Sequence, residues 1–222
     1  MLQPDTFVFL RDLKAHNTKE WFDANRDRYE AARDNVLALI DHLIEDIAGF
    51  DADLRGLEAK QCLFRINRDV RFSKNKAPYK TNFGASLSRG GRRSPFAGYY
   101  LHLEPGGVFI GGGIYMPASP QLKAIRAHID HNAPDLRAVL ADSDFQATYG
   151  ALQGEALKTA PKGYEKDHPA IDLLRMKSFI ATRAYADEQA LSPEFPRRVA
   201  DDFATLKPLL DFLNETVKEP EA

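Results

Sequence analysis

The spacing of apolar residues changes near residue 60, and this change restricts the possible folds more than any other feature of the chain. In the N-terminal quarter, apolar side chains recur at three- and four-residue steps, as in the run from Tyr29 to Ile47, which predicts helices. Beyond residue 60, apolar and polar residues alternate, which is the two-residue period of a strand. We therefore expect a helical start followed by a sheet.

Turn residues divide the middle of the chain into short strands. The predicted strands are residues 62–66, 83–88, 98–103 and 108–115, with residues 178–185 as a fifth. The turn Glu104-Pro-Gly-Gly107 joins the third strand to the fourth as a hairpin. The first four strands follow one another without a helix between them, so the sheet is expected to be largely antiparallel.

Helices are predicted on both sides of this sheet in the sequence. Asn17 is the expected N-cap of a short second helix, because Glu20 stands three residues later as in a capping box. Helices before and after a sheet, without regular β-α-β alternation, predict an α+β fold. We expect one domain over residues 1–222, with a helical N-terminal part at about 1–50, a sheet core of about five strands at about 60–117, and a mixed helical and strand part at about 118–217 whose C-terminal helices pack on the sheet.

Composition limits the possible partners and location. The net charge of −2 and the pI near 6.3 argue against a protein that coats polyanions with a basic surface all round. Cys62 is the single cysteine, which permits no internal disulfide, and no basic leader or run of 18 apolar residues occurs. His128 and His131 have the spacing of metal ligands but lack a third. We expect a soluble cytoplasmic protein with no cofactor, no metal and no membrane partner.

Positive charge is concentrated between Arg65 and Arg93. This stretch holds nine basic residues against one acid, Asp69, and therefore carries +8 within a chain of net charge −2. The basic residues are Arg65, Arg68, Arg71, Lys74, Lys76, Lys80, Arg89, Arg92 and Arg93. Such a concentration predicts a local anion site.

The core of this stretch, from Arg65 to Lys80, has residue types suited to a phosphate group. Arginine offers bidentate hydrogen bonds and lysine a point charge, while Pro78 makes a turn that directs Tyr79. Asp69 is the one carboxylate available to orient Arg65, Arg68 or Arg71. The predicted anion-binding residues are Arg65, Arg68, Arg71, Lys76, Tyr79 and Lys80, with Asp69 orienting them.

Five further residues are secondary candidates: Arg92 and Arg93 in a glycine-containing turn, Gly112, Tyr115 and His168. Free backbone N–H groups in that turn could form an anion nest. Gly112 lies in a glycine run that interrupts a strand, which marks either a bulge or a surface approached by a ligand that Tyr115 could also line. His168 is a candidate for acid–base work. No nucleophilic triad or elbow is recognisable, so catalytic residues stay unassigned, and Cys62 is expected to be inert core.

The run Arg65-x-x-Arg68-Asp69-x-Arg71-Phe72-x-x-x-Lys76-x-x-Tyr79-Lys80 resembles the signature of DUF2461, a family of uncharacterised, mainly bacterial proteins. The likeness extends over most of the chain, through the Trp21-Phe22 region, the glycine-rich strand at 108–115 and the segment from Pro161 to Lys177. The family is defined by sequence and not by an established activity. The resemblance therefore marks the motif as a functional centre and implies no reaction.

Three functions fit these observations. The first is a module that binds an anionic, phosphate-containing ligand, with a nucleotide or nucleic acid favoured. The second is an enzyme acting on an anionic small molecule, in which Tyr79, Asp69 or His168 handles a proton and a pocket joins the motif to Gly111–Gly113 and Tyr115. The third is a structural or interaction protein in which each motif arginine pairs with a helix carboxylate.

Overall fold

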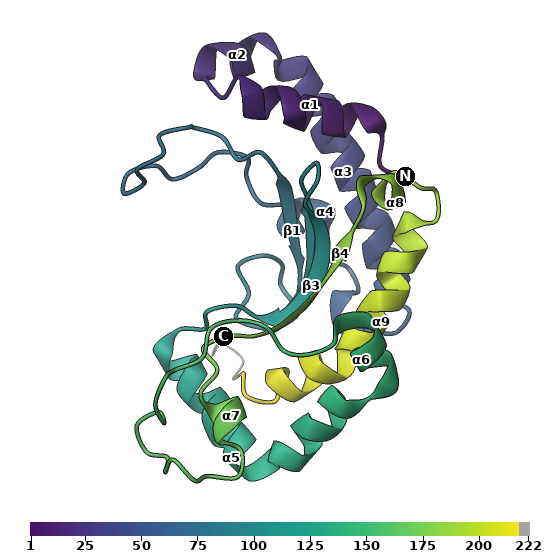
Figure 1. Cartoon of the computed structure of the whole chain (residues 1–222). Coiled ribbons are helices and arrows are strands. Elements are labelled where there is room, and N and C mark those ends of the chain that lie inside the picture. Colours follow the sequence, from purple (N-terminus) through teal and green to yellow (C-terminus); the bar gives the residue numbers. More distant parts are fainter. Residues whose placement is uncertain (218–222) are drawn as a thin grey trace. The chain divides into compact units, whose positions relative to one another are not determined.

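The structure is a computed structural model that describes residues 1–217. Helices come first, then three strands, and then helices around a fourth strand, as Figure 1 shows. The helices are α1 (Pro4–Ala15), α2 (Lys19–Ala24), α3 (Arg26–Ile47), α4 (Ala59–Cys62), α5 (Ser119–Ala141), α6 (Ser143–Tyr149), α7 (Ile171–Leu174), α8 (Asp187–Ala190) and α9 (Phe195–Asn214), with the 3-10 turn η1 (Ala52–Leu54). The strands are β1 (Phe83–Leu87), β2 (Gly98–Leu103), β3 (Val108–Ile114) and β4 (Phe179–Tyr185).

The four strands form one antiparallel sheet in the order β1-β2-β3-β4, so each strand pairs with its neighbour in sequence. N-terminal helices, an antiparallel sheet and C-terminal helices packed on it confirm the α+β prediction. The predicted number of about five strands is wrong, because the sheet has four.

The missing strand is the predicted one at 62–66. Cys62 ends α4, and the residues after it make only isolated antiparallel bridges, Leu63 to Ala85 and Asn67 to Tyr79. Between these bridges the chain advances four residues on one side, from Leu63 to Asn67, and six on the other, from Tyr79 to Ala85. The register therefore slips and no continuous ladder can form. The side-chain alternation survives: Ile66 is buried and Arg68 half-buried, while Arg65 and Asn67 are exposed.

Contacts between residues divide the chain into two compact units. Unit 1 comprises Met1–Ser94, Tyr100–Ile110 and Ala184–Asp201, and unit 2 comprises Pro95–Tyr99, Gly111–Arg183 and Asp202–Ala222. The boundaries cross β2, β3 and β4, so these strands give residues to both units. The expectation of a single domain stays a prediction.

Unit 1 is built around aromatic packing between its first three helices. The Phe9 ring of α1 lies 6.1 Å from Trp21 and 6.5 Å from Phe22 of α2, and Phe22 lies 4.9 Å from Tyr29 of α3. Phe9 and Phe22 are both buried. Rings that meet at these separations stabilise the contact beyond their buried area alone, so the two short helices are held firmly on α3.

In unit 2, α9 packs directly on strand residues. The Tyr99 ring of β2 lies 5.0 Å from Phe203, and both are buried. The Asn214 side chain at the end of α9 accepts a hydrogen bond from the backbone N–H of Ala97 at 2.7 Å. Within residues 1–217, no helix combines the length and the apolar character needed to span a bilayer.

Candidate functional site: a basic loop beside β1

The predicted motif folds as a loop that we call the basic loop, residues 65–80. Two backbone hydrogen bonds close its base: Lys80 N–H donates to the Ile66 carbonyl and Arg68 N–H to the Pro78 carbonyl, both at 2.8 Å. Figure 1 shows it as the blue-green loop, free of helix and strand, that extends away from β1. The loop and all its partners described below belong to unit 1.

Asn17 fastens the base of the loop to the turn between α1 and α2. Its side-chain amide donates to the carbonyl of Tyr79 at 3.0 Å and accepts from the N–H of Tyr79 at 3.0 Å, so it pairs with the backbone as a strand would. The prediction that Asn17 caps α2 is therefore wrong. Thr18 is the N-cap, and its hydroxyl accepts from the N–H of Trp21 at 3.2 Å.

Tyr79 points into the protein. Its ring lies 4.0 Å from the Phe22 ring at an angle of 14°, and the residue is only 6% exposed. Burial raises the pKa of Tyr79, and within residues 1–217 its hydroxyl makes no hydrogen bond. Tyr79 therefore anchors the loop to the protein. Its predicted contact with an anion stays a prediction.

Three cations of the loop are held by other parts of the loop. The Arg68 guanidinium donates to the Ala77 carbonyl at 3.0 Å and to the Ser73 hydroxyl at 3.3 Å. Lys76 Nζ donates to the Val70 carbonyl, and Lys80 Nζ donates to the Arg65 carbonyl, each at 3.0 Å. Neutral acceptors position a cation without cancelling its charge, so these bonds shape the loop and leave its field positive.

Asp69 pairs with Arg71. Its two carboxylate oxygens accept from Nε and Nη2 of Arg71 at 3.0 and 2.7 Å, and one of them also accepts from the Arg71 backbone N–H at 3.2 Å. These bonds lower the pKa of Asp69 and raise that of Arg71. Asp69 thus orients one of the three arginines that the sequence proposed for it.

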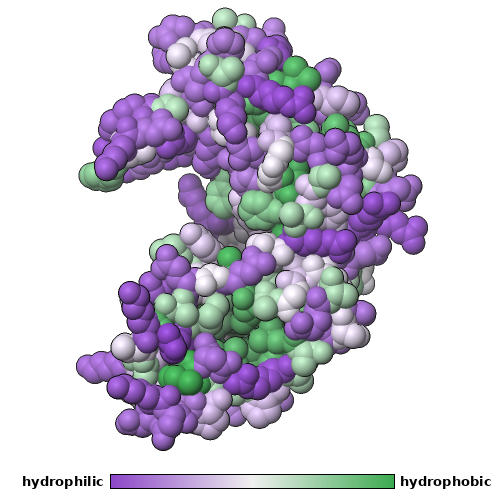
Figure 2. Space-filling model, viewed as in Figure 1, coloured by the Kyte–Doolittle hydropathy of each residue, from purple (hydrophilic) through white to green (hydrophobic). Residues whose placement is uncertain are grey.

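The tip of the loop exposes a large ring among the cations. Phe72 is 96% exposed, and the Arg71 guanidinium lies 5.9 Å from its ring centre. The side chains of Arg65 and Lys74 are exposed and have no hydrogen bond or ion pair within residues 1–217. Figure 2 shows this projecting surface as almost wholly hydrophilic. Arg65 and Lys74 are therefore the cations most available to a ligand.

The second basic group lies in a turn fastened to α4. Arg92 donates through Nη1 to the carbonyls of Lys60 and Gln61, both at 2.8 Å, and Arg93 is exposed. Gly91 has φ of +82° and its N–H donates to the Ser88 carbonyl at 2.7 Å, so that N–H is not available to an anion nest. Arg92 therefore fixes the turn to α4, while the side chain of Arg93 is exposed to solvent.

The glycine run in β3 is explained by close neighbours in unit 2. A Cβ on Gly112 would lie 2.8 Å from a methyl of Leu206 and 3.0 Å from the Gly98 carbonyl. A Cβ on Gly113, whose φ is +118°, would lie 1.9 Å from the Phe179 carbonyl oxygen. β3 thus lies closer to its neighbours than a side chain would allow. Tyr115, just beyond β3, is 72% exposed.

His168 has both ring nitrogens engaged. Nδ1 accepts from the backbone N–H of Ala170 at 3.1 Å, so it is unprotonated, and Nε2 then carries the proton that it donates to Asp130 at 2.8 Å. Neither nitrogen is left for a substrate, so the geometry favours a structural role for His168. Within residues 1–217, no group of three or more His, Cys, Asp or Glu side chains could hold a metal ion.

The sequence reasoning did not single out a polar row that runs along β2 and ends at the residue after it. The Tyr100 hydroxyl lies 3.2 Å from Nδ1 of His102, whose Nε2 lies 3.6 Å from a carboxylate oxygen of Glu104. Burial lowers the pKa of His102, and this effect is partly offset by Glu104. The signal that could have found this row is the two-residue spacing of Tyr100 and His102 within the predicted strand at 98–103, continued by Glu104 at the start of the predicted turn.

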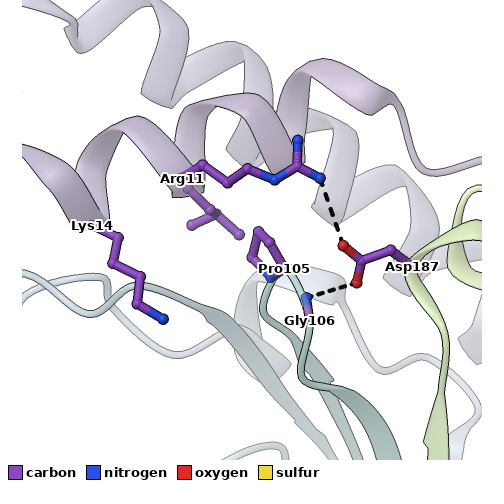
Figure 3. Close-up of a pocket in the computed structure, with 6 residues that line it drawn as sticks. Arg11, Lys14, Pro105, Gly106 and Asp187 are labelled. Carbon is purple, nitrogen blue, oxygen red and sulfur yellow. Dashed lines mark hydrogen bonds and ion pairs between the residues drawn. The ribbon is translucent and has the colours of Figure 1, made fainter.

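A pocket of about 390 Å³ in unit 1 is lined by Leu10, Arg11, Lys14, Pro105, Gly106 and Asp187 (Figure 3). Asp187 accepts from the N–H of Gly106 at 2.8 Å and lies 3.6 Å from the Arg11 guanidinium, while Lys14 lies 3.3 Å from Glu104. The two cations of this pocket are thus matched by carboxylates. We assign no anion site to it.

Cys62 should be unreactive in the folded protein. The residue is fully buried, and burial raises the pKa of its thiol to about 12. Because the thiolate is the reactive species, the native protein should react with a disulfide reagent at pH 8 more than about 100-fold slower than the urea-unfolded chain. Stopped-flow or spectrophotometric labelling measures both rates, and equal rates would contradict this burial.

The fold and the site together define an α+β protein that displays a solvent-facing, internally braced basic loop. The chain belongs to the DUF2461 family, described as conserved hypothetical proteins, whose family model matches residues 5–212. The resemblance seen in the sequence is thereby confirmed. No curated protein and no solved structure matches the chain.

Proposed function

We propose that the protein binds an anionic, phosphate-containing ligand through the basic loop, with a nucleotide or nucleic acid favoured. The loop has six basic residues and one acid, Asp69. The observation that carries the proposal is that Arg68, Lys76 and Lys80 are held by backbone carbonyls, while Asp69 is the one carboxylate that pairs with the loop within residues 1–217. A loop in which a carboxylate pairs with only one of six basic residues keeps a positive field that attracts anions.

The partners of the loop cations also support ligand binding over an internal salt-bridge network. Such a network needs carboxylates from the helices, and within residues 1–217 no ion pair joins a cation of the basic loop to a helix. The acid–base residues proposed for an enzyme are also otherwise engaged. Asp69 is bound to Arg71, and the Tyr79 ring is stacked on Phe22. Binding is therefore the function that the geometry supports best.

Removing the two free cations should weaken the binding of nucleic acid and reduce its dependence on salt. In the double variant Arg65→Ala/Lys74→Ala, the slope of log K against log salt for a single-stranded oligonucleotide should shrink by about 0.7 for each phosphate that the variant no longer neutralises. Neither side chain holds the loop together, so its fold should persist. Fluorescence anisotropy of a labelled oligonucleotide over a salt series measures the slope.

A charge-matched control removes two exposed lysines elsewhere, Lys162→Ala/Lys166→Ala in unit 2. This control should bind like the parent protein at every salt concentration. Binding that does not respond to salt, or no binding to any polyanion, would rule the proposal out. An equal loss in both double variants would assign the effect to net charge rather than to the loop.

A further inference from the structure

Four rings form a continuous row on one face of the sheet in unit 1. The Phe64 ring lies 6.4 Å from Tyr100, and Tyr100 lies 5.7 Å from Phe109 of β3. The His102 ring stacks on Phe109 at 4.5 Å with an angle of 17°. We call Phe64, Tyr100, His102 and Phe109 the aromatic row.

The aromatic row lies on the partly open face of the sheet. Along β2 exposure alternates: Leu101 and Leu103 are buried, whereas Tyr100 and His102, each one residue earlier, are partly exposed. Phe64 and Phe109 are partly exposed as well. Successive residues of a strand point to opposite faces, so the leucines face the core and the aromatic row faces outward.

The aromatic row begins where the basic loop ends. Lys80 Nζ, which donates to the carbonyl of Arg65, lies 5.5 Å from the Phe64 ring centre. Burial, together with the nearby charge of Arg65, lowers the pKa of Lys80. A strand whose phosphates contact Arg65 and Lys80 would therefore bring its bases beside Phe64.

The polar atoms beside the row lie against one another within the protein. Asn82 Nδ2 lies 3.4 Å from Nδ1 of His102, at the same atom that the Tyr100 hydroxyl approaches. Asn82 can only donate through this nitrogen, so Nδ1 is an acceptor and Nε2 carries the proton toward Glu104. Both nitrogens of His102 thus face partners within the protein. His102 is therefore available to a base only through the face of its ring.

We propose that the aromatic row is a stacking surface for unpaired nucleobases, which makes single-stranded nucleic acid the ligand class of the basic loop. The inference rests on the proposed function, because phosphate contacts at Arg65 and Lys80 are what deliver the bases. Aromatic side chains stack on the faces of unpaired bases, and cations beside them track the backbone. The bases of a duplex are already paired and stacked, so a duplex presents its phosphates and not its base faces.

The test compares single strands that have bases with an abasic strand and with a duplex. The probes are oligothymidylate, oligouridylate, an abasic strand of the same length and a duplex of the same length, each measured by anisotropy at one salt concentration. Both base-bearing strands should bind at least about tenfold more tightly than the abasic strand, since stacking of one base is worth about that factor. A difference between these two strands would report the combined effect of the sugar and of the thymine methyl group.

The matched variants replace rings with leucine, which keeps apolar volume. Phe64→Leu/Phe109→Leu should lose most of the preference for bases while binding the abasic strand as the parent does, which also shows that the variant is folded. Phe50→Leu, which changes an exposed ring just after α3 in the same unit, is the control and should leave the preference unchanged.

The outcomes separate the two proposals. If the abasic strand or the duplex binds as tightly as oligothymidylate, the stacking surface is ruled out and phosphate binding by the basic loop stands. A preference for bases that survives in Phe64→Leu/Phe109→Leu also rules out the row. If no strand binds, the proposed function fails, and the stacking surface fails with it.

Discussion

Replacing Gly113 with alanine should destabilise the protein by about 2 to 6 kcal/mol, from backbone strain of about 1 to 3 kcal/mol and overpacking of about the same size. The new Cβ would lie 1.9 Å from the carbonyl oxygen of Phe179, and the φ of +118° is one that alanine rarely adopts. β3 and β4 would have to separate to make room. Urea unfolding followed by circular dichroism measures the loss.

The matched control is Gly163→Ala in the same unit. Gly163 also has a positive φ, +96°, but no atom lies within 4 Å of a Cβ built there. This variant carries the backbone strain alone, so the difference between the two variants is the steric cost of the close strand approach. Equal losses in both would mean that β3 and β4 are not in such close contact.

Truncation of Tyr79 should have the second large effect. Tyr79→Ala removes a ring that is 6% exposed and stacked on Phe22, and loss of such a buried aromatic ring costs about 3 to 5 kcal/mol. Tyr79→Phe keeps the ring and removes only the hydroxyl, which makes no hydrogen bond within residues 1–217. Its stability should stay within about 0.5 kcal/mol of the parent.

The pair of variants also decides what Tyr79 does. If Tyr79 anchors the loop, Tyr79→Phe should bind an oligonucleotide as the parent does. A large loss of affinity in Tyr79→Phe at unchanged melting temperature would instead give the hydroxyl the ligand contact that the sequence predicted. Thermal melting and anisotropy on the same samples provide both readings.

The regular elements could be predicted where a local period was long enough. The run from Tyr29 to Ile47 repeats over several turns and became α3, and the strands at 98–103, 108–115 and 178–185 ended within one residue of the observed ones. The strand at 62–66 failed because a short apolar run fits a strand or a helical turn equally well. The Gln61 side chain accepts a hydrogen bond from the backbone N–H of Glu58 at 2.9 Å. This local bond stabilises the start of α4, the short helix that includes Cys62.

The position of the candidate site could be predicted from the sequence, but the hydrogen-bond and ion-pair partners of its side chains could not. Charge composition placed the loop at 65–80, yet nothing local distinguishes an arginine bound to a carbonyl from one bound to a carboxylate. Asn17 meets Tyr79 across 62 residues, so its local capping signal was misleading. The row of Tyr100, His102 and Glu104 was missed because alternation reveals two faces without saying which one is open.

The carbonyl-bound cations of the basic loop have a consequence for the entropy of binding. Arg68, Lys76 and Lys80 are already fixed when the chain folds, and each long side chain ordered at the moment of binding would cost about 0.5 to 1.5 kcal/mol. If the loop binds an anion as proposed, that ligand would meet a preorganised charge pattern and would lose little affinity to ordering it. The same rigidity should favour anions whose charges are spaced to match the loop over those that merely carry more charge.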